Sequence, residues 1–192
     1  MVAVNSTMVE LGSPAPHFEL PDPDGALHSL ESVSGGRPLV VAFVCNHCPY
    51  VKHIGPTFGR VALQLAGIGV SVVAISSNDV VHYPEDAPDK MAIAAKEWGW
   101  EFPYLFDEDQ AVAKAYRAAC TPDLFLYDAE LKLAYRGQFD SSRPRNNDPI
   151  DGSDLRAAAA AVVAGEPVPE PQVPSIGCNI KWREGNEPDW FA

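Results

Sequence analysis

Two of the four cysteines, Cys45 and Cys48, stand in a C-x-x-C arrangement that suits redox chemistry. Two thiols at this spacing across the start of a helix can close a small disulfide ring with little backbone motion, so they can alternate between dithiol and disulfide states. A helix N-terminus also carries about half a positive charge, which lowers the pKa of a thiol placed there. The arrangement predicts that one of the two cysteines is a reactive thiolate.

His47 lies between these cysteines, directly before Cys48. As an imidazolium it would stabilise a thiolate and therefore the reduced form, which makes the disulfide more oxidising. The alternative is a solvated loop side chain with no electrostatic role.

Zinc sites use the same C-x-x-C spacing, but a structural zinc site normally takes a second pair of similar ligands. The chain has no second C-x-x-C, although His47, His53 and Cys178 offer enough donors to complete a four-ligand set. Attachment of a c-type haem is excluded, because that pattern needs a histidine where Pro49 stands. We therefore predict no metal and no cofactor, and keep a metal-binding module as an alternative.

The tripeptide Cys120-Thr121-Pro122 is the second informative feature. A proline between a helix and a strand is a natural place for a cis peptide bond in a tight turn, although an ordinary trans turn fits as well. Cys120 by itself is typical of a small buried hydrophobic residue.

The elements that must position these residues follow from the apolar pattern. The run 37–44 is rich in β-branched residues and predicts a strand buried on both faces, which hands over to a helix that opens at Pro49. Further runs predict strands at 70–75 and 104–106, helices around 91–98 and 109–117, a hairpin of strands 124–127 and 131–135, and a last helix capped by Asp151 or Ser153 and ended by Gly165. This alternation predicts an α/β domain with a central mixed sheet flanked by helices.

The composition of the chain changes after Gly165, where several prolines favour an extended conformation. This segment also carries Cys178 and several aromatic residues, among them Trp182 and Trp190. Such rings either pack on the domain surface or engage a partner. We divide the chain into an N-terminal extension (1–13), a main domain (14–165) and an extended, proline-rich C-terminal tail (166–192) that docks on the domain or on a partner.

The length of 192 residues suits one domain with extensions, and the formal net charge of -12 opposes binding to nucleic acid or to an anionic membrane surface. No apolar run is long enough to span a membrane, and the N-terminus lacks a secretory pattern. Four cysteines are too few for a disulfide framework. We therefore expect a cytoplasmic protein whose cysteines have redox, metal-binding or catalytic roles.

Taken together, the segments FVCNHCPYVKH, SSNDVVHYPEDAPDKM, AACTPDLFLYD, YRGQFDSSRP and SIGCNIKW resemble the peroxiredoxin-like branch of the alkyl hydroperoxide reductase and thiol-specific antioxidant superfamily. The resemblance runs from about residue 14 to residue 182 and implies a thioredoxin-like fold for the main domain. It also implies that Cys45 and Cys48 are the redox pair and that Thr121 and Pro122 match the cis-proline turn facing them. Cys120 and Cys178 would then be additional or resolving thiols.

The resemblance also has departures. Peroxiredoxins place a threonine or serine three residues before the peroxidatic cysteine, where this chain has Cys45 before Cys48 and Ala42 before Cys45. The arginine that peroxiredoxins carry before the hairpin strand is replaced by the segment around Thr121. Comparison with thioredoxins makes Cys45 the nucleophile, whereas a peroxiredoxin-style alignment favours Cys48.

These features favour a thiol-disulfide oxidoreductase that uses a Cys45/Cys48 couple in an antioxidant or disulfide-exchange role. Its substrate would be a protein disulfide or a peroxide, with a thioredoxin-type protein as one candidate electron donor and a homodimer as one candidate assembly. Alternatives are a thiol peroxidase acting on hydrogen peroxide or organic hydroperoxides, a metal-binding module, and a redox-sensing adaptor that engages a partner through Trp182 and Trp190.

Overall fold

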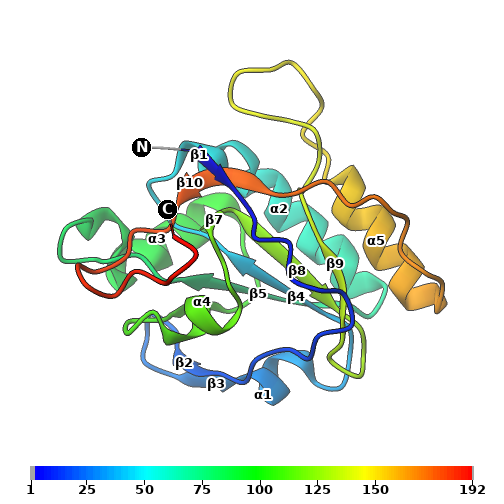
Figure 1. The fold of residues 1–192 in the computed structure, drawn as a ribbon, viewed down its shortest axis with the longest axis horizontal. Coiled ribbons are helices and arrows are strands. Elements are labelled where there is room, and N and C mark those ends of the chain that lie inside the picture. The colour runs from blue at the N-terminus through cyan, green and yellow to red at the C-terminus, as the bar shows by residue number, and fades with distance from the viewer. Residues whose placement is uncertain (1–2, 192) are drawn as a thin grey trace.

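A five-stranded sheet with the order β6-β5-β4-β8-β9 forms the centre of the computed structural model, which describes residues 3–191 (Figure 1). β4 (Leu39–Phe43) pairs in parallel with β5 (Ser71–Ser76), and β5 pairs in parallel with β6 (Tyr104–Phe106). β8 (Asp123–Tyr127) runs antiparallel to both β4 and β9 (Leu133–Arg136). The predicted mixed central sheet is confirmed.

Side chains of β4 fill two hydrophobic clusters because successive residues of a strand point to opposite faces. Val40 and Ala42 join the cluster under the long helix α2 (Pro49–Gly67), and Val41 and Phe43 join the cluster on the other face. Figure 1 shows α2 and α5 on one side of the sheet and α1 and α4 on the other. The other helices are α1 (Leu30–Ser34), the short 3-10 helix η1 (Pro84–Asp86), α3 (Pro88–Trp98), α4 (Ala111–Ala115) and α5 (Ser153–Ala164).

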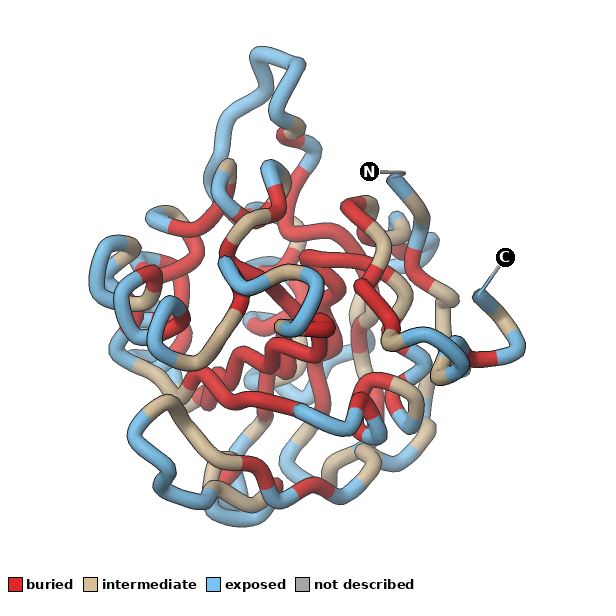
Figure 2. Tube along the Cα trace, turned by 90° about the vertical axis from the view of Figure 1, so that its left-hand side faces the viewer, coloured by how far each residue is buried: buried red, intermediate tan, exposed pale blue. Residues whose placement is uncertain are grey.

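The two ends of the chain meet in a second, antiparallel sheet with the order β1-β10-β7. In it β10 (Ile176–Asn179), from the C-terminal segment, lies between β1 (Ala3–Asn5) and β7 (Cys120–Thr121). Trp182, which follows β10, is buried in the cluster that also holds Phe43. Figure 2 shows the contrast between this buried interior and the exposed loop that projects between β9 and α5.

Two local predictions were wrong. The second hairpin strand begins at Leu133 rather than at 131, because Leu131 has a positive φ of 57° and belongs to the turn. The N-cap of α5 is Gly152, with a φ of 65°, and neither Asp151 nor Ser153 caps the helix through its side chain. The carboxylate of Asp140 accepts the backbone N–H groups of Asp151 and Gly152 at 2.8 Å each. A side chain from the preceding loop therefore sets the start of the helix.

The sequence pattern did not reveal the hairpin of β2 (Glu19–Pro21) and β3 (Leu27–Ser29), nor the short helix α1 that follows. These elements have three to five residues each, too few for a periodic pattern to be visible. Between residues 3 and 191, no helix is both long and apolar enough to cross a membrane.

Candidate active site

Cys45 and Cys48 lie where β4 ends and α2 begins. Cys48 is the N-cap residue of α2, and Pro49 occupies the first turn, where a missing N–H costs nothing. The side chains of both cysteines are buried, with exposures of 1% for Cys45 and 0% for Cys48. The structure therefore puts the pair at the positive end of a helix and shields it from bulk water.

The turn after β7 faces this pair. The Thr121–Pro122 peptide bond is cis. The Cys45 sulfur lies 3.5 Å from the hydroxyl oxygen of Thr121, and the Cys48 thiol donates to the Thr121 carbonyl oxygen over 3.1 Å. Two elements that are more than 70 residues apart in the chain thus meet at the cysteines.

The C-terminal segment brings a third thiol to the same place. Cys178 pairs in register with Thr121, whose carbonyl oxygen accepts from the Cys48 thiol, and it lies in the same buried cluster as Cys45 and Cys48. The preceding Gly177 makes this approach feasible, because a Cβ atom at that position would lie 1.9 Å from the Thr121 carbonyl oxygen. Cys45, Cys48 and Cys178 therefore gather around Thr121.

Gly177→Ala is expected to lower the free energy of unfolding by at least about 2 kcal/mol, because the added methyl group forces β10 away from rigid backbone. Gly67→Ala is the matched control, since a Cβ at that helical position meets nothing within 4 Å and alanine favours a helix. Urea denaturation of both variants tests this. Equal stability of Gly177→Ala and the wild type would contradict the close packing.

The pKa values of these three thiols are shifted in different directions. The thiol of Cys178, and after it that of Cys45, lower the pKa of Cys48. The neighbouring Cys48 raises the pKa of Cys178, while burial raises the pKa of Cys45. Of the three thiols, Cys48 is the one whose pKa is lowered.

Cys120 has different surroundings. Its sulfur donates to the carbonyl oxygen of Pro122 over 3.4 Å, and burial raises its pKa. These are the properties of a small buried hydrophobic residue rather than of a reactive thiol.

Asp86 organises the loop between the two cysteines. Its buried carboxylate accepts the backbone N–H groups of Asn46 and His47 at 2.8 and 3.1 Å, and the side-chain amide of Asn78 at 2.8 Å. The Nδ1 atom of His47 lies 2.6 Å from the second carboxylate oxygen of Asp86. Sequence reasoning missed Asp86, because an aspartate about 40 positions away carries no local signal of this contact.

Asp86 also influences the acid-base behaviour of His47. The hydrogen bond to Asp86 is the largest influence on this imidazole and raises its pKa. The His47 ring stacks on Tyr83 with centroids 5.5 Å apart, and its Nδ1 atom lies 4.0 Å from the Cys45 sulfur. His47 is therefore a fixed and partly buried group, not a solvated loop side chain.

Within the part of the chain that the structure describes, the residues that could hold a metal ion are Cys45, His47 and Asp86, whose ligand atoms lie within 4.8 Å of one another. The Asp86 oxygens already accept four hydrogen bonds, so a cation would have to displace some of them. His53 takes no part, since its Nε2 atom lies 3.1 Å from the Ser142 hydroxyl. The arrangement fits a hydrogen-bonded thiol site better than a metal centre.

Comparison with known proteins shows which family the chain belongs to. Residues 11–136 match the family model described as AhpC/TSA family. The chain belongs to the AhpC/TSA family. This confirms the resemblance drawn from the sequence and makes the protein a peroxiredoxin-like, thiol-dependent oxidoreductase.

Three relatives illustrate the range of similarity. The crystal structure of an uncharacterized conserved protein from Geobacillus kaustophilus is 52% identical, with a TM-score of 0.92 over 95% of this chain and 97% of that one. A Mycobacterium tuberculosis protein named as a putative peroxiredoxin is 31% identical over 113 residues, 59% of this chain and 67% of that one. Peroxidoxin BcpB from the same species is 24% identical over 80% of this chain and 96% of that one, with a TM-score of 0.60, and shares the thioredoxin-like fold.

Proposed function

We propose that this protein catalyses thiol-disulfide exchange with Cys48 as the attacking sulfur and Cys45 as its partner in the dithiol-disulfide couple. The observation that carries the proposal is the position of Cys48, at the start of α2 and in one buried cluster with Cys45 and Cys178. A helix start lowers the pKa of a thiol placed there, and the cluster supplies two candidate resolving thiols.

In the proposed reaction the Cys48 thiolate attacks a substrate disulfide, forms a mixed disulfide and releases one substrate thiolate. Cys45 then loses its proton and attacks the Cys48 sulfur, which closes the internal disulfide and releases the second substrate thiolate. A thiol donor, for which a thioredoxin-type protein is one candidate, restores the two thiols. The net change is transfer of two electrons from the donor to the substrate. We place this activity in the cytoplasm, where a reducing thiol pool supplies the donor.

A peroxidase is the second candidate function, and membership of the AhpC/TSA family favours it. Here the Cys48 thiolate attacks a peroxide, the alcohol or water leaves, and the resulting sulfenic acid condenses with Cys45 to give the disulfide and water. Cys45 stands where peroxiredoxins carry a threonine or serine, and its thiol lowers the pKa of Cys48. The Thr121 hydroxyl, which donates to the Cys178 carbonyl oxygen, lies 3.5 Å from the Cys45 sulfur and adds a polar group beside the pair.

One experiment separates the two candidates. Fully reduced protein is mixed with hydrogen peroxide, the rate of thiol loss is measured, and mass spectrometry identifies the cysteines that pair. A rate far above that of free cysteine supports the peroxidase, and a rate like that of free cysteine supports disulfide exchange with a protein substrate. Absence of turnover with either substrate would instead favour a redox-sensing adaptor, and tightly held stoichiometric zinc would favour a metal-binding module.

A further inference from the structure

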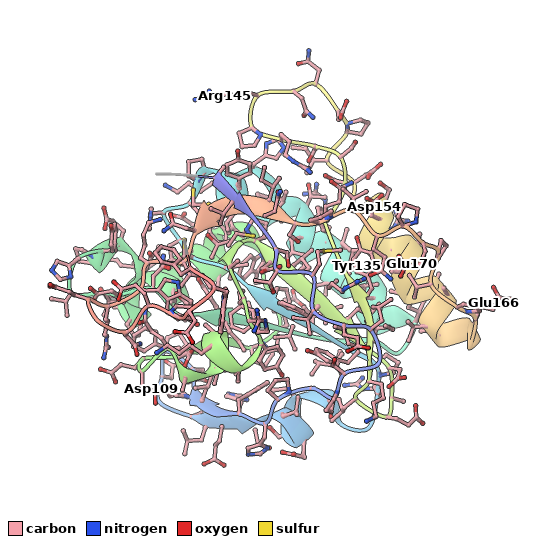
Figure 3. All side chains as sticks on the ribbon, viewed as in Figure 1. Asp109, Tyr135, Arg145, Asp154, Glu166 and Glu170 are labelled. Carbon is pink, nitrogen blue, oxygen red and sulfur yellow. The ribbon has the colours of Figure 1, made fainter. Side chains whose placement is uncertain are left out.

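A cavity of about 480 Å³ lies beside Cys178 and is bounded by β1, the first turn of α2 and the loop between β9 and α5. Tyr50, Arg143, Arg145 and Cys178 are among the residues that line it. Figure 3 shows Arg145 on that loop, on the side above β1 and β10. Cavities of about 300–1,000 Å³ are typical of sites for small molecules.

The charge of this cavity is opposite to that of the molecule as a whole. The chain has a net charge of -12, yet among residues 3–191 the charged ones that line the cavity are Arg143 and Arg145. The Arg143 guanidinium donates to the carbonyl oxygens of Asp140 and Ser142 and to the side-chain carbonyl of Gln138, all of which are neutral acceptors. Among the ion pairs of residues 3–191, neither arginine takes part. The cavity therefore offers two uncompensated cations to an anionic ligand.

The cavity also gives access to one sulfur of the proposed site. Cys178 lines it, whereas Cys48 is fully buried and does not. A ligand held by the arginines therefore meets Cys178, whose strand partner Thr121 contacts both Cys45 and Cys48.

We propose that this cavity binds a small thiol that carries carboxylate groups, and that this thiol reduces the enzyme's disulfide by attacking the sulfur of Cys178. The inference rests on the proposed function, which supplies the disulfide. It names the electron donor as a small molecule rather than a protein.

The protein disulfide is reduced in three successive thiol-disulfide exchanges. The Cys178 sulfur, after losing its proton, attacks Cys48 of the Cys45–Cys48 disulfide, so that Cys48–Cys178 forms and Cys45 takes up the proton. The thiolate of the bound donor then attacks the Cys178 sulfur and expels the Cys48 thiolate. A second donor thiol attacks the mixed disulfide, which leaves the Cys178 thiol and the oxidised donor. Two donor thiols thus become one disulfide and give up two electrons and two protons. The protein takes both electrons and one proton, and the second proton goes to solvent while Cys48 remains a thiolate.

The burial of the two sulfurs agrees with this direction of attack. Cys178 is 4% exposed and lines the cavity, whereas Cys48 is fully buried and does not line it. A donor held in the cavity therefore attacks Cys178, and Cys48 is the sulfur that leaves.

The test compares glutathione, which has two carboxylates, with its diethyl ester, which has the same thiol without them. Oxidised protein is mixed with each at equal thiolate concentration, and the rate of disulfide reduction is followed. We expect glutathione to be faster by about tenfold, a factor that one charge-assisted hydrogen bond can supply. Arg145→Gln should lose most of this preference. The matched control Arg156→Gln, an exposed arginine on α5 with the same loss of charge, should keep it.

Two further measurements serve as a control and as a direct test of attack at Cys178. Dithiothreitol, a neutral reductant, should act equally on the wild type and on both arginine variants. In Cys48→Ser, incubation with glutathione disulfide should leave a glutathione adduct on Cys178, identified by peptide mass.

The inference and the proposed function fail in different ways. Equal rates with glutathione and its diethyl ester, or equal behaviour of the two arginine variants, would overturn the inference while the disulfide itself still forms. If oxidation produces no disulfide at Cys48, the proposed function fails and the inference fails with it.

Discussion

Replacing Cys48 by serine is expected to abolish turnover and also the first chemical step. A serine hydroxyl is not ionised near neutral pH, so it cannot replace a thiol whose pKa is lowered by its neighbours. Loss of an attacking nucleophile lowers turnover by several orders of magnitude. Single-turnover mixing of the reduced variant with a substrate disulfide, followed by mass spectrometry, should show no mixed disulfide at position 48.

Cys45→Ser is the matched comparison, because it removes the neighbouring thiol but keeps Cys48. This variant should form the mixed disulfide once, or the sulfenic acid with a peroxide, and then stop or continue slowly through Cys178. The opposite pattern, with the first step lost in Cys45→Ser and kept in Cys48→Ser, would make Cys45 the nucleophile, as the comparison with thioredoxins suggests.

Replacing Asp86 by asparagine is expected to lower the free energy of unfolding by about 3 kcal/mol, the typical cost of removing one partner of a buried ionic pair. The carboxylate is 0% exposed, and an amide cannot accept hydrogen bonds on both atoms that now face donors. The exposed Asp89, paired with Lys90 at the surface, gives the control Asp89→Asn, which should be nearly neutral.

The effect of Asp86→Asn should also depend on pH. Asp86 raises the pKa of His47 in the folded protein, so the unfolded state releases this proton at a lower pH than the folded state does. The stabilisation is therefore fully present below about pH 6.5, the ordinary histidine pKa, and is lost as the pH rises through the folded-state value. Urea denaturation from pH 5.5 to 9, about the range over which the imidazole titrates, measures the free energy of unfolding of both proteins. The difference between wild type and Asp86→Asn should become smaller as the pH rises. A difference that stays constant or grows would contradict a charged His47–Asp86 pair.

Several parts of the fold could be predicted from local patterns. The buried strand before the cysteines, the parallel strand that follows, and the helix that opens at Pro49 all appear in the structure. The antiparallel hairpin after Pro122 was also predicted, with its second strand displaced by two residues. These features depend on runs of apolar residues and on proline at helix starts, which are properties of consecutive residues.

The start of α5 shows where such patterns stop being sufficient. Asp151 and Ser153 both have side chains that cap helices, yet the cap is Gly152 because Asp140 occupies the backbone N–H groups there. A contact from another loop overrides a local preference whenever it satisfies the same donors.

The sequence by itself determined the C-x-x-C motif, its place between a strand and a helix, and the family resemblance. Only the tertiary structure decided that Cys178 joins these two cysteines, since that depends on the strand register that brings it to Thr121. The same holds for the contact of Asp86 with His47 and for the two arginines beside Cys178. Hydrophobic periodicity reports which face of an element is buried, but hydrogen bonds and charge pairs between distant segments depend on how those faces are packed together.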